Sequence, residues 1–515
     1  MLVKTFCAEV MGLEATTVTI EVNLTRGMLF HLSGLADTAV KESYDRIRAA
    51  ISNIGLKPPT ADITINLSPA DIRKEGSGYD LPLAIGILAA HGKVSDSMLG
   101  EYMMMGELGL DGKLKPVSGL LSVAIRARKE KFKGLLVPKE NVREAAVVNN
   151  LEVYGMDNLV DVIGFLNGCD NYEPTTVDTR KEFYEQQYSY DLDFADVKGQ
   201  ESVKRALEVA AAGGHNLIMI GPPGSGKSMM AKRLPSILPP LSLAESLETT
   251  QIHSVAGKLT SGTSLISQRP FRSPHHTVSQ VALTGGTNKP RPGEVSLAHN
   301  GVLFLDELTE FSKSTLEVLR QPLEDRRITI SRAKYTVEYP CSFMFVASMN
   351  PCPCGYYGDP THQCTCTPGQ ISRYLSKISG PLLDRIDIHC EIQAVPFAQL
   401  SQMQSGEPSA VIRERVIAAR KIQEERFKSF KGIHCNAMMT ERMLHEFAEP
   451  DGDSLDMLRM AMERLKLSAR AYSRILKVAR TIADLAGSEK VASQHIAEAI
   501  GYRNLDRGDW AERGI

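Results

Sequence analysis

The sequence predicts a multidomain α/β protein whose central part is built on a parallel β-sheet. Short, wholly apolar segments alternate with helical stretches across the middle of the chain, which is typical of parallel strands covered on both faces. An alternating strand followed by an amphipathic helix opens the chain and indicates an α+β N-terminal domain. From about residue 396 onward the sequence is charged and rich in helical patterns, which predicts a C-terminal helical domain.

The chain of 515 residues is too long for one ordinary core. We predict an N-terminal domain (1–168), a polar linker (169–190), a parallel-sheet domain (191–395) that contains a cysteine loop (352–366), and a helical lid (396–515). In the first domain we expect strands near 18–24 and 63–67 and helices over 36–51 and from about 81. In the sheet domain we expect strands at 217–220, 302–305, 343–347 and 386–388.

Composition narrows the class of protein but leaves its partner open. With 43% hydrophobic and 23% charged residues, the chain is typical of a globular protein in solution. It contains no apolar run of roughly 20 residues and no secretory signal pattern, so we expect a cytoplasmic protein without membrane partners. The net charge of −2 neither indicates nor excludes nucleic acid, because a ring can gather its basic residues in the pore.

A glycine-rich phosphate loop is the most specific motif. It follows the apolar strand at 217–220, precedes a helical stretch, and consists of Gly221, Pro222, Pro223, Gly224, Ser225, Gly226, Lys227 and Ser228. Backbone N–H groups of such a loop surround phosphates, and the following helix directs its N-terminus at them. We expect Lys227 to reach the β- and γ-phosphates of ATP and Ser228 to ligate Mg²⁺.

Two later strands end in polar residues that complete this pattern. The apolar strand at 302–305 ends at Asp306 and Glu307. Asp306 is suited to coordinate Mg²⁺, and Glu307 is suited to polarise the attacking water. A further apolar strand ends at Asn350. Strand, phosphate loop, acidic pair and amide occur in the order expected of an ATP-hydrolysing site.

Four of the nine cysteines crowd into one short segment, as Cys352, Cys354, Cys364 and Cys366. Four thiolates are a common ligand set for structural Zn²⁺, although the spacing is C-x-C instead of the usual C-x₂-C. His362 is an alternative ligand, and a reduced loop without metal is the other interpretation. Because the loop directly follows Asn350, it could tie a DNA-contacting element to the state of the ATP site.

Residues 327–339 alternate as a β-hairpin, and its basic tip contains Arg332 and Lys334. The hairpin lies at the point where the branch of AAA+ ATPases that includes replicative helicases, which this chain resembles, carries a pore hairpin. This resemblance implies that both residues contact the phosphate backbone of DNA without reading its bases. The stretch before Asp306 includes Arg272, His275 and His276, which either face DNA or nucleotide or serve as an ordinary loop feature.

The order of these motifs resembles that of AAA+ ATPases, and within them the magnesium-chelatase-like proteins of the ComM/YifB family. The segments FRSPHHTVS (271–279), PRPGEVSLAHNGVLFLDE (290–307), NPCPCGYYGDP (350–360) and SGPLLDRIDIH (379–389) carry this resemblance. It implies that Asn350 positions the lytic water, that Arg385 is an arginine finger, and that Arg470 is the sensor arginine of the lid, with Arg474 as competitor. An arginine finger acts on a neighbour's ATP, so the resemblance implies a homo-oligomer, most simply a hexameric ring.

The N-terminal domain resembles the proteolytic domain of Lon through residues 73–82, 106–109 and 112–117. Aligning the patterns puts Gly78 at the position of the nucleophilic serine and Val123 at that of its lysine, while Ser77 stands one residue early. A serine–lysine pair is needed for this type of nucleophilic catalysis. We therefore expect a domain without protease activity that serves ring assembly or substrate contact.

The ComM resemblance implies a DNA helicase that drives branch migration in homologous recombination and natural transformation. Two alternatives remain open. One is the ATPase subunit of a magnesium chelatase, which would not be expected to carry the Lon-like domain or the cysteine loop. The other is a protein-remodelling machine.

Overall fold

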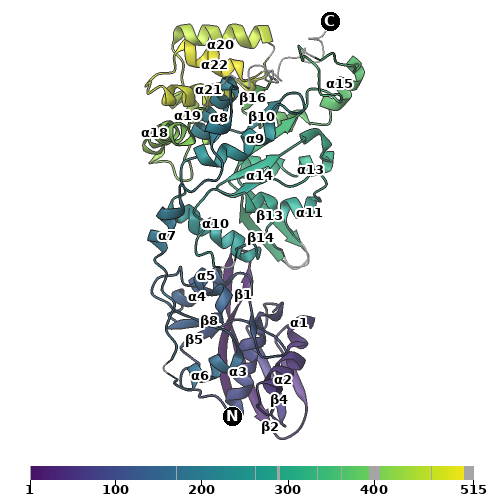
Figure 1. Ribbon diagram of the computed structural model, residues 1–515, viewed down its shortest axis with the longest axis vertical. Coiled ribbons are helices and arrows are strands. Elements are labelled where there is room, and N and C mark those ends of the chain that lie inside the picture. Colours follow the sequence, from purple (N-terminus) through teal and green to yellow (C-terminus); the bar gives the residue numbers. More distant parts are fainter. Residues whose placement is uncertain are drawn as a thin grey trace.

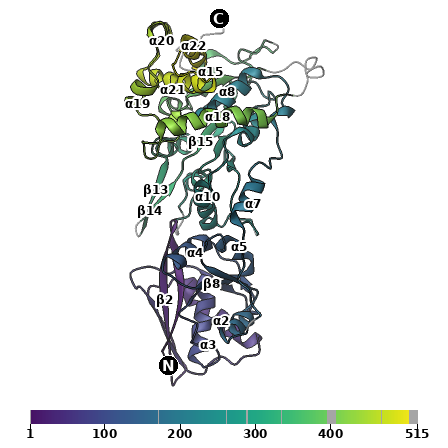
Figure 2. The ribbon, with the colours of Figure 1, turned by 90° about the vertical axis from the view of Figure 1, so that its left-hand side faces the viewer.

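Three structural regions follow one another along the long axis of the molecule (Figure 1). The structure is a computed structural model that describes residues 2–169, 171–260, 262–286, 290–332, 335–360, 362–393, 406–465 and 467–503. The N-terminal region occupies one end, the parallel-sheet region lies in the middle, and the C-terminal helices lie at the opposite end (Figures 1 and 2). Within the described ranges, no helix is both long and apolar enough to cross a membrane.

The N-terminal region is built on a seven-stranded mixed sheet. Its order is β3-β4-β2-β1-β5-β8-β9, and β1 and β2 form its long antiparallel pair. Val18, Ile20 and Val22 are buried along β2, because alternate residues of a strand point to one face. The strands are β1 (Leu2–Met11), β2 (Glu14–Thr25), β3 (Phe30–Ser33), β4 (Asp62–Ser68), β5 (Tyr102–Met104), β8 (Gly134–Pro138) and β9 (Glu152–Met156), with a small pair β6 (Glu107–Leu108) and β7 (Leu114–Lys115).

Helices cover this sheet, and α3 is buried almost throughout because its sequence is apolar on all sides. The helix expected over 36–51 is divided at Glu42 into α1 and α2. The helices are α1 (Thr38–Lys41), α2 (Ser43–Asn53), α3 (Asp80–Ala90), α4 (Leu120–Lys129), α5 (Val142–Ala145) and α6 (Leu159–Leu166).

The segment 169–190, expected to be an unpatterned linker, contains the helix α7 (Thr179–Gln186). Asp178 caps its N-terminus, and Phe183 is only 2% exposed. Glu182 pairs with Arg143 of the N-terminal region at 2.6 Å and accepts a hydrogen bond from Ser264 at 2.7 Å. One apolar side chain in a polar helix is too weak a pattern to predict, yet burying it anchors this segment.

The middle region contains a five-stranded, wholly parallel sheet in the order β11-β12-β15-β10-β16. Its strands are β11 (Phe271–Arg272), β12 (Val302–Leu305), β15 (Met344–Met349), β10 (Leu217–Ile220) and β16 (Ile388–Glu391). The predicted strand at 386–388 was therefore placed too early. Ile386 ends the turn before β16, and the buried Asp387 receives hydrogen bonds from His215 and Arg474.

Both faces of this sheet are covered, as apolar strands require. Alternate residues such as Met219 and Ile218 enter two separate cores. The helices of this region are α8 (Glu201–Gly213), α9 (Lys227–Arg233), α10 (Leu243–Val255), α11 (Gln280–Thr284), α12 (Glu294–Leu297), α13 (Lys313–Glu317), α14 (Arg320–Asp325), α15 (Pro368–Leu375) and α16 (Gly380–Leu383). The expected hairpin is present as β13 (Arg327–Arg332) paired with β14 (Tyr335–Pro340).

The C-terminal region is helical, as its sequence predicts, and shares a core with α8 and one face of the parallel sheet. Its helices are α18 (Ser409–Phe427), α19 (Glu441–Phe447), α20 (Gly452–Leu465), α21 (Ala469–Leu485) and α22 (Ser493–Gly501). At the other end of the sheet region, α10 docks on the N-terminal region (Figure 2). Gln251 of α10 donates to the Leu13 carbonyl at 2.6 Å, and Gly119 N–H donates to the Ser254 carbonyl at 3.1 Å.

Candidate nucleotide site and cysteine cluster

The phosphate loop begins at the carboxyl end of β10, between β15 and β16. Gly226 has φ of +88°, a conformation that glycine adopts readily, and it leads directly into α9. The Lys227 ammonium donates to the carbonyls of Gly221 and Pro222 at 2.8 Å each and to Asn350 Oδ1 at 3.2 Å. Burial lowers the pKa of Lys227, and the carboxylates of Asp306 and Glu307 oppose that shift. The predicted lysine and amide therefore meet at one point.

Asp306 lies on the other side of the loop, at the end of β12. Its Oδ2 accepts a hydrogen bond from Ser228 Oγ at 2.6 Å, and its Oδ1 accepts one from Ser348 Oγ. A serine hydroxyl beside a carboxylate is the oxygen ligand set that suits Mg²⁺ in phosphate-binding sites. Ser348 on β15 is a residue that the sequence analysis missed, because a serine inside an apolar strand carries no motif.

Glu307 has φ of +54°, so the chain turns sharply after Asp306. Its N–H donates to Ser348 Oγ at 3.3 Å, which fixes the backbone, while its side chain is 60% exposed. His276 Nδ1 lies 4.0 Å from Glu307 Oε2, and the His276 ring contacts that of His275 at a centroid distance of 4.0 Å. Of the two histidines, His276 thus faces the candidate base.

Glu307 and Asn350 open onto a shared pocket of about 550 Å³. Its remaining walls are His276 and Pro353, whose segments the sequence analysis had connected with the site, and residues that it had not: Thr309, Glu310, Gln370, Arg373, Tyr374 and Lys377. Four of these side chains belong to α15 or the turn after it. The helix that follows the cysteine loop therefore forms one wall of the pocket beside the candidate hydrolytic residues.

The three arginines considered as finger or sensor have different environments. Arg385 donates to Glu324 of α14 and to the Pro381 carbonyl. Arg470 Nη1 donates to Asp384 Oδ2 at 2.8 Å, and its side chain is 71% exposed. Among the described residues, neither Arg385 nor Arg470 makes an ion pair or hydrogen bond with the phosphate loop. Arg470 is exposed at Asp384, whereas the Arg385 side chain is only 14% exposed and is held by Glu324.

Arg474 is part of a buried network instead. Its Nη1 donates to Asp387 Oδ1 at 2.9 Å, and Asp387 Oδ2 lies 3.2 Å from His215 Nδ1. The other ring nitrogen of His215 lies 2.8 Å from Thr481 Oγ1 on α21. Burial raises the pKa of Asp387, but Arg474 and His215 outweigh it and hold that pKa below its usual value. Arg474 therefore joins α21 to the base of β16.

The basic hairpin projects from the sheet region toward the N-terminal region (Figure 2). Ile328, Ile330 and Tyr339 anchor it in the core. Arg332 is exposed at the end of β13, with Nη2 at 3.5 Å from the Gly286 carbonyl, whereas Lys334 lies outside the described residues. Arg272 is engaged by Glu294 through two hydrogen bonds of 2.6 and 2.7 Å, which makes it a structural residue here.

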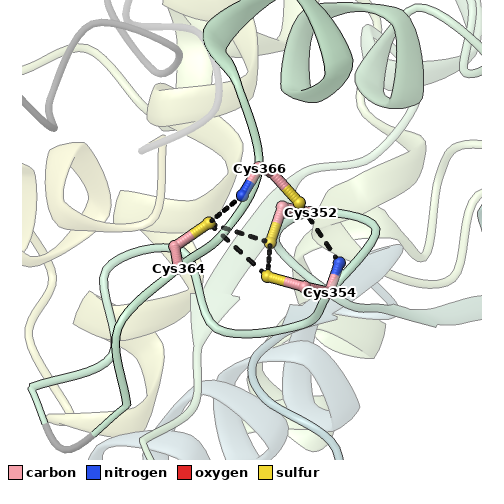
Figure 3. Close-up of side chains that lie close together, drawn as sticks. All are labelled: Cys352, Cys354, Cys364 and Cys366. Atoms are coloured by element: carbon pink, nitrogen blue, oxygen red, sulfur yellow. Dashed lines mark hydrogen bonds between the residues drawn. The ribbon is translucent and has the colours of Figure 1, made fainter.

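The four cysteines of the loop converge (Figure 3). Their sulfurs all lie within 4.8 Å of one another. The Sγ–Sγ distances are 3.3 Å for Cys352–Cys354, 3.7 Å for Cys352–Cys364 and 3.5 Å for Cys354–Cys364. His362 lies outside this group, since its ring stacks on Tyr356 and pairs with Asp359. The cluster is the one group of candidate metal ligands found among the described residues.

The Lon-like region does not assemble a serine–lysine pair from the predicted positions. Ser77 Oγ donates to Glu107, and Val123 is fully buried in α4. Ser77 and Gly78 line a cavity of about 580 Å³ between this region and the segment that contains Ser254, Gly257 and Thr260. Its carboxylates include Glu9, Glu75 and Glu107, so the chemistry of this groove is acidic.

The sequence is similar to those of known proteins over nearly its whole length. The family described as magnesium chelatase, subunit ChlI, matches residues 193–400, a second model, subunit ChlI of Mg-chelatase, matches 20–141, and its C-terminal model matches 406–503. The chain is 44% identical to "Competence protein ComM" of Haemophilus influenzae over 499 residues and 43% identical to "Uncharacterized protein YifB" of Escherichia coli over 502 residues, with 96% of each chain covered. It is 31% identical over 159 residues to "Lon protease 2" of Bacillus subtilis, which covers 28% of this chain and 27% of that protein. These matches, together with the parallel sheet and its phosphate loop, show that the chain belongs to the ComM and YifB family of magnesium-chelatase-type AAA+ ATPases.

Proposed function

We propose that this protein is a DNA motor driven by ATP hydrolysis at the carboxyl edge of the parallel sheet. The meeting of Lys227 with Asn350, and of Ser228 with Asp306, carries the catalytic part of this proposal. Lys227 would exchange the loop carbonyls for the β- and γ-phosphates. Ser228 and Asp306 would hold Mg²⁺, which would neutralise charge on the phosphates. Glu307 would accept a proton from the water that Asn350 positions.

We propose that the active form is a homohexamer in which Arg385 acts on the neighbour's ATP as an arginine finger and Arg470 is the sensor arginine of the lid. Two points support action of the finger in trans. Among the described residues, Arg385 pairs with Glu324 and Arg470 pairs with Asp384, and neither of these partners belongs to the phosphate loop of the same chain. In addition, a finger supplied by an adjacent subunit stabilises charge on the transferred phosphoryl group without perturbing nucleotide binding by its own subunit.

The DNA substrate and the branch-migration role are supported by the family and by the hairpin. One relative that is similar over 96% of both chains is named a competence protein. The family resemblance implies branch migration during recombination and transformation. Arg332 is exposed on a hairpin whose apolar side is anchored in the core, which suits repeated contact with a phosphate backbone. The N-terminal region would serve assembly or substrate contact, without peptidase activity.

The cysteine cluster is proposed to hold structural Zn²⁺. A tetrahedral Zn²⁺ with Zn–S bonds of about 2.3 Å separates its sulfurs by about 3.8 Å. The observed Sγ–Sγ distances of 3.3, 3.5 and 3.7 Å are close to that value, so the ligands need little rearrangement. Four thiolates fill the tetrahedral coordination of Zn²⁺ and leave no open position for a substrate. The role proposed for the ion is therefore structural.

ATP turnover measured with forked DNA, single-stranded DNA or an unfolded protein separates the proposed motor from a protein-remodelling machine. We expect forked DNA to stimulate turnover and the unfolded protein to have no effect. Arg332→Ala combined with Lys334→Ala should retain basal turnover and lose the stimulation. Stimulation by unfolded protein alone would refute the DNA assignment while leaving the ATPase intact.

A further inference from the structure

The cysteine loop connects two parts of the pocket beside the hydrolytic residues. It begins next to Asn350, which binds the ammonium of Lys227, and it ends next to Pro368, where α15 begins. Pro353 inside the loop and Arg373 on α15 both line the pocket that holds Glu307. A link among the four sulfurs therefore fixes the chain on both sides of one pocket wall.

The loop also touches the phosphate loop directly, at Gly355. A Cβ added at Gly355 would lie 2.7 Å from Pro223 Cδ and 3.9 Å from Asn350 Cγ. Ordinary van der Waals contact begins near 3.4 Å, so there is no room for a side chain here. Gly355 follows Cys354 in the chain, so the position of the sulfur cluster determines how closely the loop supports Pro223.

We propose that the metal-bound cysteine loop is a positioning element for ATP hydrolysis, through Gly355 against Pro223 and through Cys352 next to Asn350. This inference rests on the proposed ATPase activity and on the proposed Zn²⁺ site. When Zn²⁺ holds the four thiolates, the loop has one closed shape, which keeps the phosphate loop and Asn350 in register with Glu307. Without the metal, the loop loses this constraint, and turnover falls more than nucleotide affinity does.

The first test changes the ligands. Cys352→Ser combined with Cys364→Ser should lose the zinc that wild-type protein contains at about one ion per chain. It should lower kcat by between about tenfold and a hundredfold, the scale of sub-ångström to 1 Å misplacement, with a much smaller change in the Kd for a fluorescent ATP analogue. Cys169→Ser, at an exposed cysteine outside the loop, is the matched control and should change neither. Wild-type protein stripped by a chelator should regain kcat on addition of Zn²⁺.

The second test leaves all four ligands in place. Gly355→Ala would push Pro223 by about 0.7 Å or more, whereas Gly358→Ala in the same loop meets nothing within 4 Å. Both glycines have positive φ, +88° and +78°, so backbone strain is matched. We expect both variants to keep their zinc, and Gly355→Ala alone to lose turnover by about tenfold or more.

The outcomes separate the claims. Equal turnover in Gly355→Ala and Gly358→Ala, together with unchanged kcat in a zinc-free cysteine variant, would overturn the positioning role and leave both the ATPase and the metal site standing. Wild-type protein that turns over ATP but holds no zinc would overturn the metal site and this inference with it. Wild-type protein that binds zinc but hydrolyses no ATP would instead overturn the proposed ATPase function.

Discussion

Arg474 and Arg470 lie one helical turn apart on α21. Replacing Arg474 with alanine should lower stability, whereas replacing Arg470 should lower the rate of ATP hydrolysis. Arg474 pairs with Asp387, which is only 1% exposed. Removing this arginine takes away the largest influence that lowers the pKa of Asp387 and leaves a buried carboxyl group with His215 and the Asn216 N–H as hydrogen-bond partners. Arg470, in contrast, pairs with Asp384 at the surface.

The expected magnitudes follow from burial. Breaking a buried ion pair by deleting one partner costs about 3–5 kcal/mol. Because the Arg474 side chain is 26% exposed, we expect the low end, a loss of about 3 kcal/mol in the free energy of unfolding. The Arg470 pair is solvent-exposed, and its loss should cost at most about 1 kcal/mol.

Urea unfolding followed by far-UV circular dichroism, combined with ATP turnover, checks this prediction. Arg474→Ala should shift the unfolding midpoint, and Arg474→Lys should restore part of the shift because it restores the charge. Arg470→Ala should unfold like the wild type but lose turnover by about a hundredfold, the scale for removing one transition-state donor. A wild-type midpoint for Arg474→Ala, with turnover lost only in that variant, would show that Arg474 is the sensor arginine and refute this reasoning.

Four further variants test the site. Lys227→Ala should abolish nucleotide binding in an equilibrium assay with a fluorescent ATP analogue, because the phosphate charge loses its buried cation. Glu307→Gln should bind ATP normally and stall, with Glu310→Gln in the same pocket as control; normal turnover in Glu307→Gln would identify the wrong carboxylate. Arg385→Ala should cut hydrolysis by about a thousandfold or more, and mixing it with Lys227→Ala protein should restore part of the activity; absence of recovery in mixed rings would contradict action in trans. Arg332→Ala with Lys334→Ala should lower the slope of log affinity against log salt for forked DNA by nearly one unit per lost phosphate contact, and an unchanged slope would make the hairpin structural.

The sequence predicted those parts of the fold that are encoded in contiguous patterns. The apolar strands at 217–220 and 302–305 are present at those positions, because a strand buried on both faces needs an unbroken apolar run. The strand predicted at 343–347 begins one residue later, at Met344, and ends two residues later, at Met349. The strand predicted at 386–388 was too early because β16 (Ile388–Glu391) contains the buried polar residue His389, which interrupts the apolar pattern of a parallel strand.

Contacts between distant segments could not be predicted. Ser348 meets Asp306 only because β15 and β12 are neighbours in a parallel sheet, and neither residue type nor spacing reveals that pairing. His276 follows β11 and Glu307 follows β12, and the two residues come close because these strands are neighbours in the same sheet. Arg470 and Arg474 look equivalent in sequence, and only the structure shows that Arg470 is exposed while the partner of Arg474 is buried.

The central claim is that ATP hydrolysis at Glu307 drives movement of DNA strands. The most direct measurement is branch migration of a synthetic four-way junction, followed by separation of labelled products on a gel, with wild-type protein and Glu307→Gln at equal DNA occupancy. We predict that the wild type converts the junction to duplex products only with hydrolysable ATP, and that Glu307→Gln binds the junction but produces none. Product formation by Glu307→Gln, or its absence with a wild-type protein that hydrolyses ATP on the same DNA, would contradict this account.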